Sequence, residues 1–287
     1  MKLYDQHLHS ANSVDSRSDP GDVVRAAIGA GLAGVTFTEH YDPHESEWDV
    51  CIYDYERIAQ AVAVLREQYG DQIFIGHGIE VDYQRERMPY VLDHLTSHRF
   101  DLVILAVHFF DGRALHHREH WGSLSPDAAT RAYLATVLEA AQLALELDRR
   151  GQRPFDVLAH LDLVKRYTQR YFGCYDVASH RAAIDSILQT CLAANLIPEL
   201  NCSSLRQSLP ETLPADWAVR RYADLGGRAM TLGSDAHALE HVGAGLDEGA
   251  AILQENAIRH QAVFMNRQRY DLPLEEEDRE VGHAFRA

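Results

Sequence analysis

The sequence predicts an α/β protein of one domain whose parallel strands close into a barrel. Apolar runs alternate with amphipathic segments along the chain, and such alternation favours parallel strands joined by right-handed helical crossovers. Seven runs of this kind suit a closed barrel, and histidine or acidic residues stand at the ends of six of them. Barrel enzymes build their sites from the ends of many strands, whereas an open doubly wound sheet would gather these residues near one switch point.

The expected strands are the seven apolar runs, which span residues 2–7, 34–38, 73–80, 102–108, 156–161, 197–202 and 229–234. Helical periodicity is clearest over residues 20–31, 53–69, 126–149, 176–195 and 214–225. Asp19-Pro20 and Ser125-Pro126 mark the starts of the first and third of these helices, because a polar capping residue followed by proline suits a first helical turn. The segment 109–124 has no periodicity and is expected to form a loop over the mouth of the barrel.

Composition excludes several classes of function. A chain of 287 residues with 46% hydrophobic residues can bury one large core. The net charge of −16 argues against binding to nucleic acid or to an anionic membrane. No apolar stretch approaches the roughly 20 residues that a membrane span needs, and the first residues contain no signal-peptide core. We expect residues 1–272 to form a soluble domain and the acidic residues 273–287 to form a flexible tail.

The four cysteines, at positions 51, 174, 191 and 202, form no CxxC pair and have no zinc-finger spacing. They are typical of reduced thiols rather than of a disulfide framework, so we expect a cytoplasmic protein.

The residues at the strand ends predict a metal centre. In an extended segment residues i and i+2 point the same way, so His7 and His9 can bind one ion, as can Asp235 and His237. A lone histidine at a strand end is more often structural, but six coincidences of this kind favour a multi-metal hydrolytic centre. The six motifs are His7-Leu8-His9, Thr38-Glu39-His40, Gly78-Ile79-Glu80, Ala106-Val107-His108, Leu158-Ala159-His160 and Gly233-Ser234-Asp235-Ala236-His237.

In this order, and together with Asp5-Gln6 and His160-Leu161-Asp162, the motifs resemble those of the polymerase and histidinol phosphatase (PHP) family, and within it the histidinol-phosphatase branch. The similarity covers roughly residues 1–270. The resemblance implies a distorted seven-stranded (β/α)7 TIM-like barrel with a trinuclear metal site.

The resemblance also implies which side chains hold the three ions. The first ion would be held by His7, His9, Glu80 and Asp235, the second by Glu80, His108 and His160, and the third by Asp15, His40 and His237. Glu80 would bridge the first two. Asp15 has an alternative role as the side chain of an Asx turn in the loop 13–16.

This mixture of imidazole and carboxylate ligands suits Zn, Mn or Fe(II), whereas a magnesium site would be mostly oxygen. A bridging carboxylate lets two cations lie about 3.5–4 Å apart, and a water between them can become a hydroxide nucleophile near neutral pH. The third cation can bind phosphate oxygens and offset the charge of the leaving group.

A phosphate substrate also needs donors from the protein. The resemblance implies that Arg206 binds phosphate, and a guanidinium matches phosphate bidentately. The alternative is a surface arginine paired with Glu211. Lys165 and Arg166, after the fifth strand, are second candidates for phosphate binding.

Asp162, two positions after His160, is expected to face the same pocket. It would either orient a ligand histidine or protonate the leaving oxygen. Of the remaining histidines, His77 is expected to pack on the opposite side of its strand. Four more, His94, His98, His180 and His260, are expected on the surface. His116, His117 and His120 are expected in a solvated loop, with contact to substrate as the alternative.

The leading hypothesis is therefore a metal-dependent phosphomonoesterase of histidine biosynthesis that hydrolyses L-histidinol phosphate to L-histidinol and phosphate. A second hypothesis keeps the centre and changes the substrate to another small phosphorylated metabolite, a nucleotide, or a phosphodiester. The net charge of −16 weakens the phosphodiester version. A third hypothesis is a non-catalytic PHP domain, which the nine filled ligand positions disfavour.

Overall fold

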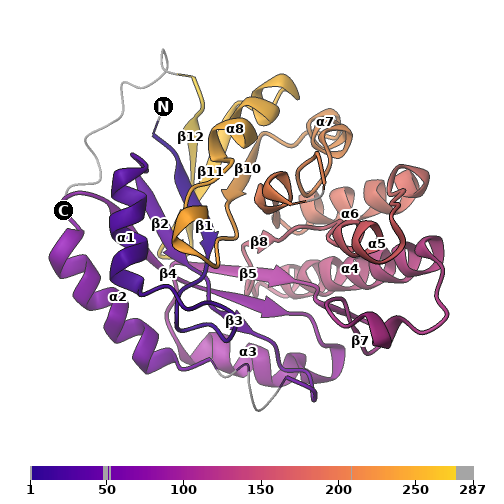
Figure 1. The fold of residues 1–287 in the computed structure, drawn as a ribbon, viewed down its shortest axis with the longest axis horizontal. Helices are drawn as coiled ribbons and strands as arrows, with labels where there is room; N and C mark the ends of the chain where they lie inside the picture. Colours follow the sequence, from indigo (N-terminus) through magenta and orange to yellow (C-terminus); the bar gives the residue numbers. More distant parts are fainter. Residues whose placement is uncertain (1, 48–50, 52, 208, 276–287) are drawn as a thin grey trace.

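A mostly parallel sheet forms the centre of the structure, a computed structural model that describes residues 2–47, 51, 53–207 and 209–275 (Figure 1). Its ten strands follow the order β1-β2-β4-β5-β8-β9-β10-β11-β12, and β3 pairs with β4. Only β12 runs antiparallel to its neighbour. The strands are β1 (Tyr4–Leu8), β2 (Gly34–Phe37), β3 (His40–Tyr41), β4 (Phe74–Asp82), β5 (Leu102–Ala106), β8 (Val157–Leu158), β9 (Ile197–Asn201), β10 (Ala229–Gly233), β11 (His260–Met265) and β12 (Gln268–Pro273).

All seven expected strands are present, in the expected order, but the sheet has ten strands rather than seven. The fifth expected strand is reduced to Val157–Leu158. The strands missed from the sequence are β3 and the β11–β12 hairpin. Asn266 and Arg267 form the two-residue turn of this hairpin at φ 51° and 63°. A turn with positive φ at both positions suits a hairpin, but Asn-Arg is a weaker sequence signal for it than Asn-Gly.

Eight α-helices lie outside the sheet in the described part of the chain (Figure 1). Five cover the expected segments, while α3, α5 and α8 were not expected. The two expected capping residues act as such: Asp19 accepts from the N–H groups of Gly21 and Asp22, and Ser125 accepts from that of Ala128. The helices are α1 (Pro20–Gly29), α2 (Tyr55–Tyr69), α3 (Met88–Ser97), α4 (Pro126–Arg149), α5 (Val164–Phe172), α6 (Arg181–Ala193), α7 (Asp216–Asp224) and α8 (Leu246–Glu255).

The segment 109–124 is more ordered than a plain loop. It contains a small hairpin, β6 (Phe109–Phe110) with β7 (Arg113–Ala114), and then a 3₁₀ turn, Arg118–Trp121. Trp121 is 1% exposed and its indole N–H donates to the carbonyl of Ala114. The buried indole fixes this segment on the domain.

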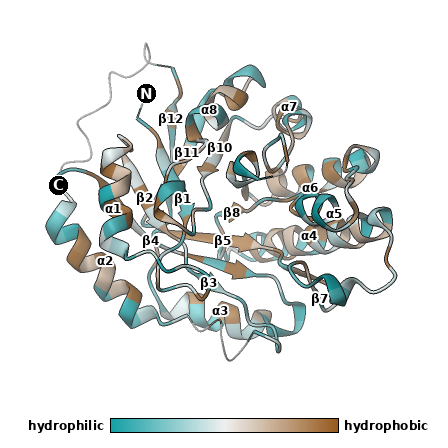
Figure 2. Ribbon diagram, in the orientation of Figure 1, coloured by the Kyte–Doolittle hydropathy of each residue, from teal (hydrophilic) through white to brown (hydrophobic). Residues whose placement is uncertain are grey.

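The sheet is buried on both faces, as expected of parallel strands in an α/β protein. Along β5, Val103 and Leu105 join the large core beneath the helices, whereas Leu102, Ile104 and Ala106 belong to a second, smaller cluster. Successive residues of a strand point to opposite faces, which explains this division. Brown, hydrophobic ribbon follows the central strands in Figure 2, and teal, hydrophilic ribbon is prominent on the outer helices.

The first strand lies beside the last ones. Leu8 forms a parallel bridge with Ala236, and the N–H of Asp235 donates to the carbonyl of His7 at 2.7 Å. In the middle of β1 the contact to β11 is made by a side-chain amide, because Gln6 Oε1 accepts from the N–H of Phe264 at 2.6 Å. These bonds bring residues from both ends of the described chain to one place.

None of the described helices is both long enough and apolar enough to cross a membrane. Of the expected tail, Pro273 ends β12 and Leu274 is buried, while residues 276–287 lie outside the described residues.

Candidate metal centre

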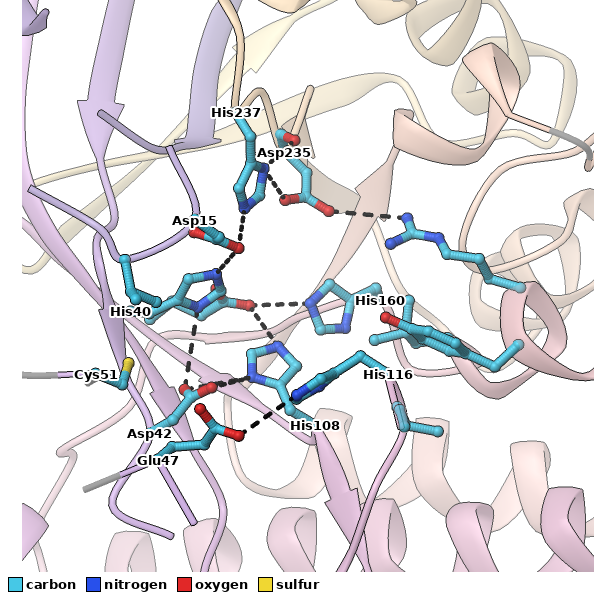
Figure 3. A pocket seen from close by; sticks show the side chains of 16 residues that line it. Asp15, His40, Asp42, Glu47, Cys51, His108, His116, His160, Asp235 and His237 are labelled. Atoms are coloured by element: carbon cyan, nitrogen blue, oxygen red, sulfur yellow. Dashed lines mark hydrogen bonds and ion pairs between the residues drawn. The ribbon is translucent and has the colours of Figure 1, made fainter. Parts of the chain in front are cut away.

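The carboxyl ends of the parallel strands bring the predicted ligands together. His7 lies within β1, Glu80 lies within β4, and His40 begins β3. The other strand-end ligands come one to four residues after their strands. Asp15 comes from the loop between β1 and α1. One cavity of about 420 Å³ is lined by Asp15, His40, Glu80, His108, His160, Asp235 and His237. Figure 3 labels all of these except Glu80. His7 and His9 are not among the residues that line it.

Glu80 stands at the middle of this arrangement and is fully buried. Its carboxylate oxygens lie 2.8–3.6 Å from ring nitrogens of five histidines: His7, His9, His40, His108 and His160. A carboxylate surrounded in this way can bridge two cations that the imidazoles also bind.

Several buried atoms of the centre have no hydrogen-bond partner within the described chain. They include Nε2 of His7, Nε2 of His9, Nδ1 of His40 and Oε2 of Glu80. Buried polar atoms are normally paired, and unpaired imidazole nitrogens that converge on a carboxylate are the donor set of a transition metal. Four groups of three side chains have ligand atoms close enough for one ion: His7-His9-Asp235, His7-Glu80-His160, His40-Glu80-His108 and His9-His40-His237. The residues therefore fit a cluster of divalent cations.

Asp15 lies where a third ion would need it. Its Oδ2 is 3.4 Å from His40 Nε2 and 3.0 Å from His237 Nε2. No Asx-turn hydrogen bond from Asp15 is found among the described residues, and its carboxylate faces these two imidazoles instead.

A ring of outer partners orients the imidazoles. Asp42 faces His108 Nδ1 at 3.2 Å, Ser13 faces His9 Nδ1 at 3.2 Å, and Glu199 faces His7 Nδ1 at 2.7 Å. A partner on the far ring nitrogen fixes the tautomer and leaves the other nitrogen free for a metal. Glu39 belongs to the same outer ring, since it is buried and accepts from Ser13 Oγ at 2.6 Å.

Glu199 reaches the centre because of a glycine. A Cβ at Gly233 would lie 2.2 Å from Glu199 Oε1 and 2.6 Å from His7 Cβ. Only glycine permits this close approach. Glu199 also accepts from the N–H of His160 at 3.0 Å. One carboxylate therefore orients the ring of His7 and holds the backbone of His160, which follows β8.

Electrostatics favours the ligand forms of Glu80 and His9. Burial would raise the pKa of Glu80, but the imidazoles of His7, His108 and His40 outweigh it and hold the pKa well below its usual range. Burial, together with His237 and His40, lowers the pKa of His9 to about 3. An ionised carboxylate and a neutral imidazole are the ligand forms of these groups. Burial alone would lower the pKa values of His7, His40 and His108, but neighbouring carboxylates raise them, so these imidazoles would release protons when a cation binds.

Arg206 has a different position from the one we expected. Its Nη1 donates to the carbonyl of Ser234 at 2.7 Å and its Nη2 to that of Asp235 at 2.8 Å. It does not line the cavity, and it does not pair with Glu211. Asp235 has a positive φ of 52°, which is uncommon for a residue other than glycine. The guanidinium thus stabilises the backbone turn that presents a ligand.

Lys165 and Asp162 also differ from expectation, because they form a buried ion pair at 2.8 Å. The ammonium of Lys165 is 0% exposed and makes two further contacts, with Glu211 Oε1 at 3.1 Å and the carbonyl of Thr212 at 2.7 Å. Asp162 accepts from the N–H of Ala215 at 3.2 Å, and within the described part of the chain it makes no hydrogen bond or ion pair with a predicted ligand histidine. A fully buried ammonium with three oxygen partners cannot reach phosphate, so this role of Lys165 is not retained.

Arg166 is the arginine that does line the cavity. Its side chain is 16% exposed, its Nη2 donates to Ser203 Oγ and lies 3.8 Å from Asp235 Oδ2, and its buried Nε has no partner among the described residues. Tyr167 lines the same cavity and was missed from the sequence. Arg166 therefore has donor capacity on the side of the cavity where Asp235 lies.

Three of the residues that sequence reasoning missed share one signal. Asp42, Asp82 and Asn201 lie two positions after His40, Glu80 and Glu199, on the same face of each extended segment. Applying the alternation to every strand end would have found them. Burial and Asp42 raise the pKa of Asp82 to about 7, and Asp82 accepts from the N–H of His108 at 2.5 Å.

Of the other histidines, His77 is buried as expected, whereas His94 is less exposed than expected. His77 is 5% exposed and packs away from the centre, as expected, with Nε2 2.9 Å from the Tyr53 hydroxyl. His94 was expected on the surface, but its ring packs against Tyr41 with centroids 5.0 Å apart, and burial lowers its pKa to about 4.

Comparisons with known proteins agree with this geometry. The PHP domain family matches residues 5–203. A probable histidinol-phosphatase from Thermotoga maritima is 27% identical over 262 residues, covering 91% of this chain and 95% of the relative. A histidinol-phosphatase from Lactococcus lactis is 25% identical over 270 residues, covering 92% of this chain and 95% of the relative.

The fold is shared with solved structures. Histidinol phosphate phosphatase from Lactococcus lactis, crystallised with zinc, L-histidinol and phosphate, superposes with a TM-score of 0.82 at 23% identity, covering 94% of this chain and 99% of that one. A putative histidinol phosphatase from Listeria monocytogenes gives a TM-score of 0.74 at 19% identity, covering 85% and 99%.

Proposed function

The chain belongs to the PHP domain family, and on that premise we propose that it is a metal-dependent phosphomonoesterase that hydrolyses L-histidinol phosphate to L-histidinol and phosphate. The observation that carries the proposal is the convergence of five imidazoles on the buried carboxylate of Glu80. The substrate rests on the relatives from Thermotoga maritima and Lactococcus lactis, which cover more than nine tenths of the chain and are described as histidinol-phosphatases.

We infer three divalent cations. His7, His9, Glu80 and Asp235 would hold the first, Glu80, His108 and His160 the second, and Asp15, His40 and His237 the third. The overlapping groups of ligand atoms and the unpaired ring nitrogens support this arrangement. Zn, Mn and Fe(II) all suit these ligands, and zinc is favoured because the Lactococcus lactis enzyme was crystallised with it. The bound ions would activate a water and offset the charge of the phosphate.

The protein's own groups orient and bind. Glu199, Ser13 and Asp42 fix the tautomers of His7, His9 and His108. We propose that Arg166 binds the phosphate oxygens, because its guanidinium lines the cavity beside Asp235 and its Nε is free of partners among the described residues. A charge-assisted, two-pronged contact of this kind positions a phosphate for in-line attack.

Arg206 and Asp162 then act as positioning residues. Arg206 holds the carbonyls of Ser234 and Asp235, and so keeps a ligand carboxylate in place. Asp162 joins Lys165 to the N–H of Ala215, and so connects the start of α5 to the segment before α7.

We extend the proposal to the surroundings of the site. The bridge between Leu8 and Ala236 supports closure of the sheet into a distorted barrel built on the seven strands expected from the sequence. Residues 1–272 would form its single domain, together with Pro273 at the end of β12 and the buried Leu274. The four cysteines without a disulfide suit a cytoplasmic biosynthetic enzyme.

A second candidate keeps the same centre and acts on another small phosphorylated metabolite or a nucleotide. The cavity of about 420 Å³ is large enough for substrates of that size.

One assay distinguishes these candidates. Phosphate release is measured from L-histidinol phosphate and from a panel of nucleotide and sugar phosphates, with metal content determined for each preparation and Glu80→Gln purified in parallel. We expect the highest kcat/KM for L-histidinol phosphate. A higher value for a panel member would support the second candidate, and no release from any substrate by metal-loaded protein would indicate a non-catalytic domain.

A further inference from the structure

A second group of metal-binding side chains lies at the rim of the cavity, apart from the centre around Glu80. Nε2 of His116 is 3.5 Å from Glu47 Oε1, and Nε2 of His117 is 4.0 Å from the same oxygen. The ligand atoms of Glu47, His116 and His117 all lie within 4.8 Å of one another. Figure 3 shows Glu47 and His116 facing each other beside the cavity.

The spacing suits a tetrahedral ion. Metal–nitrogen distances of about 2.0–2.1 Å place neighbouring ligand atoms about 3.3–3.5 Å apart in a tetrahedral zinc site. The observed 3.5 and 4.0 Å need only small side-chain rotations to reach that value. Two imidazoles and one carboxylate form a common ligand set for zinc and leave a fourth position open.

Two independent contacts hold the imidazoles in place. The far nitrogen of His117, Nδ1, lies 3.2 Å from Glu119 Oε1. A carboxylate on the far nitrogen is the usual partner of a metal-bound histidine, because it fixes the tautomer and raises the basicity of the ring. The ring of His116 stands edge-on to the buried ring of Phe109, with centroids 6.0 Å apart.

We propose that Glu47, His116 and His117 bind one additional divalent cation of the zinc type. This ion would join the segment that follows β3 to the loop that follows β7. Glu47 and His116 line the same cavity as His40 and His108, so the ion would fix one wall of the cavity and face an incoming phosphate with positive charge. The site does not depend on which phosphomonoester the protein hydrolyses.

His120 serves as a control within the same loop. It is exposed and its ring lies near that of His117, but its Nδ1 accepts from the N–H of Ala114 at 3.4 Å. It belongs to none of the groups that could hold an ion among the described residues. His120→Gln therefore removes an imidazole from the loop without touching the proposed ligands.

The number of bound ions tests the proposal. The full-length wild type, Glu47→Gln, the double variant His116→Gln/His117→Gln and His120→Gln are dialysed against zinc, freed of excess metal, and analysed by elemental mass spectrometry. We expect Glu47→Gln and the double variant to hold one zinc per chain fewer than the wild type, and His120→Gln to equal it. Because the result is a difference between variants, it is independent of the number of ions around Glu80 and of activity.

Equal zinc content in the wild type and the double variant would overturn the proposal, as would the same loss in His120→Gln. Hydrogen exchange provides a second readout that needs no stoichiometry. Added zinc should slow exchange of the backbone amides of residues 44–47 and 114–118 in the wild type and leave the double variant unchanged. A zinc response that is the same in both proteins would also overturn the site.

Discussion

Nδ1 of His7 lies 2.7 Å from Glu199 Oε1, and this contact turns the opposite ring nitrogen towards Glu80, 3.3 Å away. The sequence places the two residues 192 positions apart. Glu199 therefore decides which nitrogen of a ligand is available for a metal.

Glu199→Gln keeps the shape of the side chain and removes its charge. We expect metal affinity or turnover to fall about 10–100-fold, because an outer carboxylate fixes the ligand tautomer and raises its basicity. Zinc affinity is measured by competition with a chromogenic chelator, beside Glu248→Gln as an exposed control on α8. An affinity equal to that of the wild type would show that Glu199 supports only the fold.

Glu80→Gln should abolish turnover and lower the metal content. The substitution removes the charge that faces five imidazoles and would bridge two ions. Each lost factor of ten in rate corresponds to about 1.4 kcal/mol of barrier, and we expect several such factors. Near-normal turnover with full metal occupancy in this variant would refute the bridging role.

Chelation should inactivate the protein slowly and reversibly. Most of the ligands are buried, so metal release is expected to limit the rate of inactivation. Activity should return when Zn, Mn or Fe(II) is added, and the order of recovery would rank the ions. Activity that survives long incubation with chelator, with metal content shown to be near zero, would exclude the mechanism.

Arg166→Lys and Arg206→Lys should have different effects. Arg166→Lys loses the two-pronged contact with phosphate, at a cost of about 1.5–3 kcal/mol, and should raise KM with metal content unchanged. Arg206→Lys loses one of two bonds to the carbonyls of Ser234 and Asp235, and should lower metal retention and thermal stability instead. Kinetics and metal content are measured on the same preparations. If Arg206→Lys raised KM with full metal occupancy, Arg206 would be the phosphate-binding residue after all.

His77 should make the fold less stable in acid. Burial, with Arg66 and His98, lowers its pKa to about 4, against about 6.5 in an unfolded chain. Between about pH 4 and pH 6.5 the imidazole of His77 is protonated in the unfolded chain but not in the folded one. The contribution of neutral His77 to the free energy of unfolding is therefore complete above about pH 6.5. It is lost as the pH falls towards 4, on the order of 3 kcal/mol in all. Urea unfolding at about pH 7.5 and about pH 5 should show a smaller loss of stability for His77→Gln than for the wild type. An equal loss in both proteins would assign the acid sensitivity to other groups.

The sequence predicted the elements with strong periodicity and the ligands at strand ends. The alternation of residues places His7 beside His9 and Asp235 beside His237, and the structure brings both pairs together in the metal centre. It could not predict the partners of the charged residues, because these depend on distant segments. Lys165 illustrates the difference. Side chains three positions apart can meet at a helical turn, but the sequence did not predict α5. Nothing therefore indicated that Lys165 would pair with Asp162 inside the protein.

Asp5 accepts from the N–H of Ser234 at 2.9 Å, across 229 positions of sequence, just beside the bridge between Leu8 and Ala236. During synthesis at about 5–20 residues per second, the first ligands would wait on the order of ten to fifty seconds for the last. The centre cannot form until the strands between His9 and Asp235 have been synthesised. The centre is thus a late product of translation, and an interrupted chain that ends before Asp235 should emerge without it, however well its earlier strands fold.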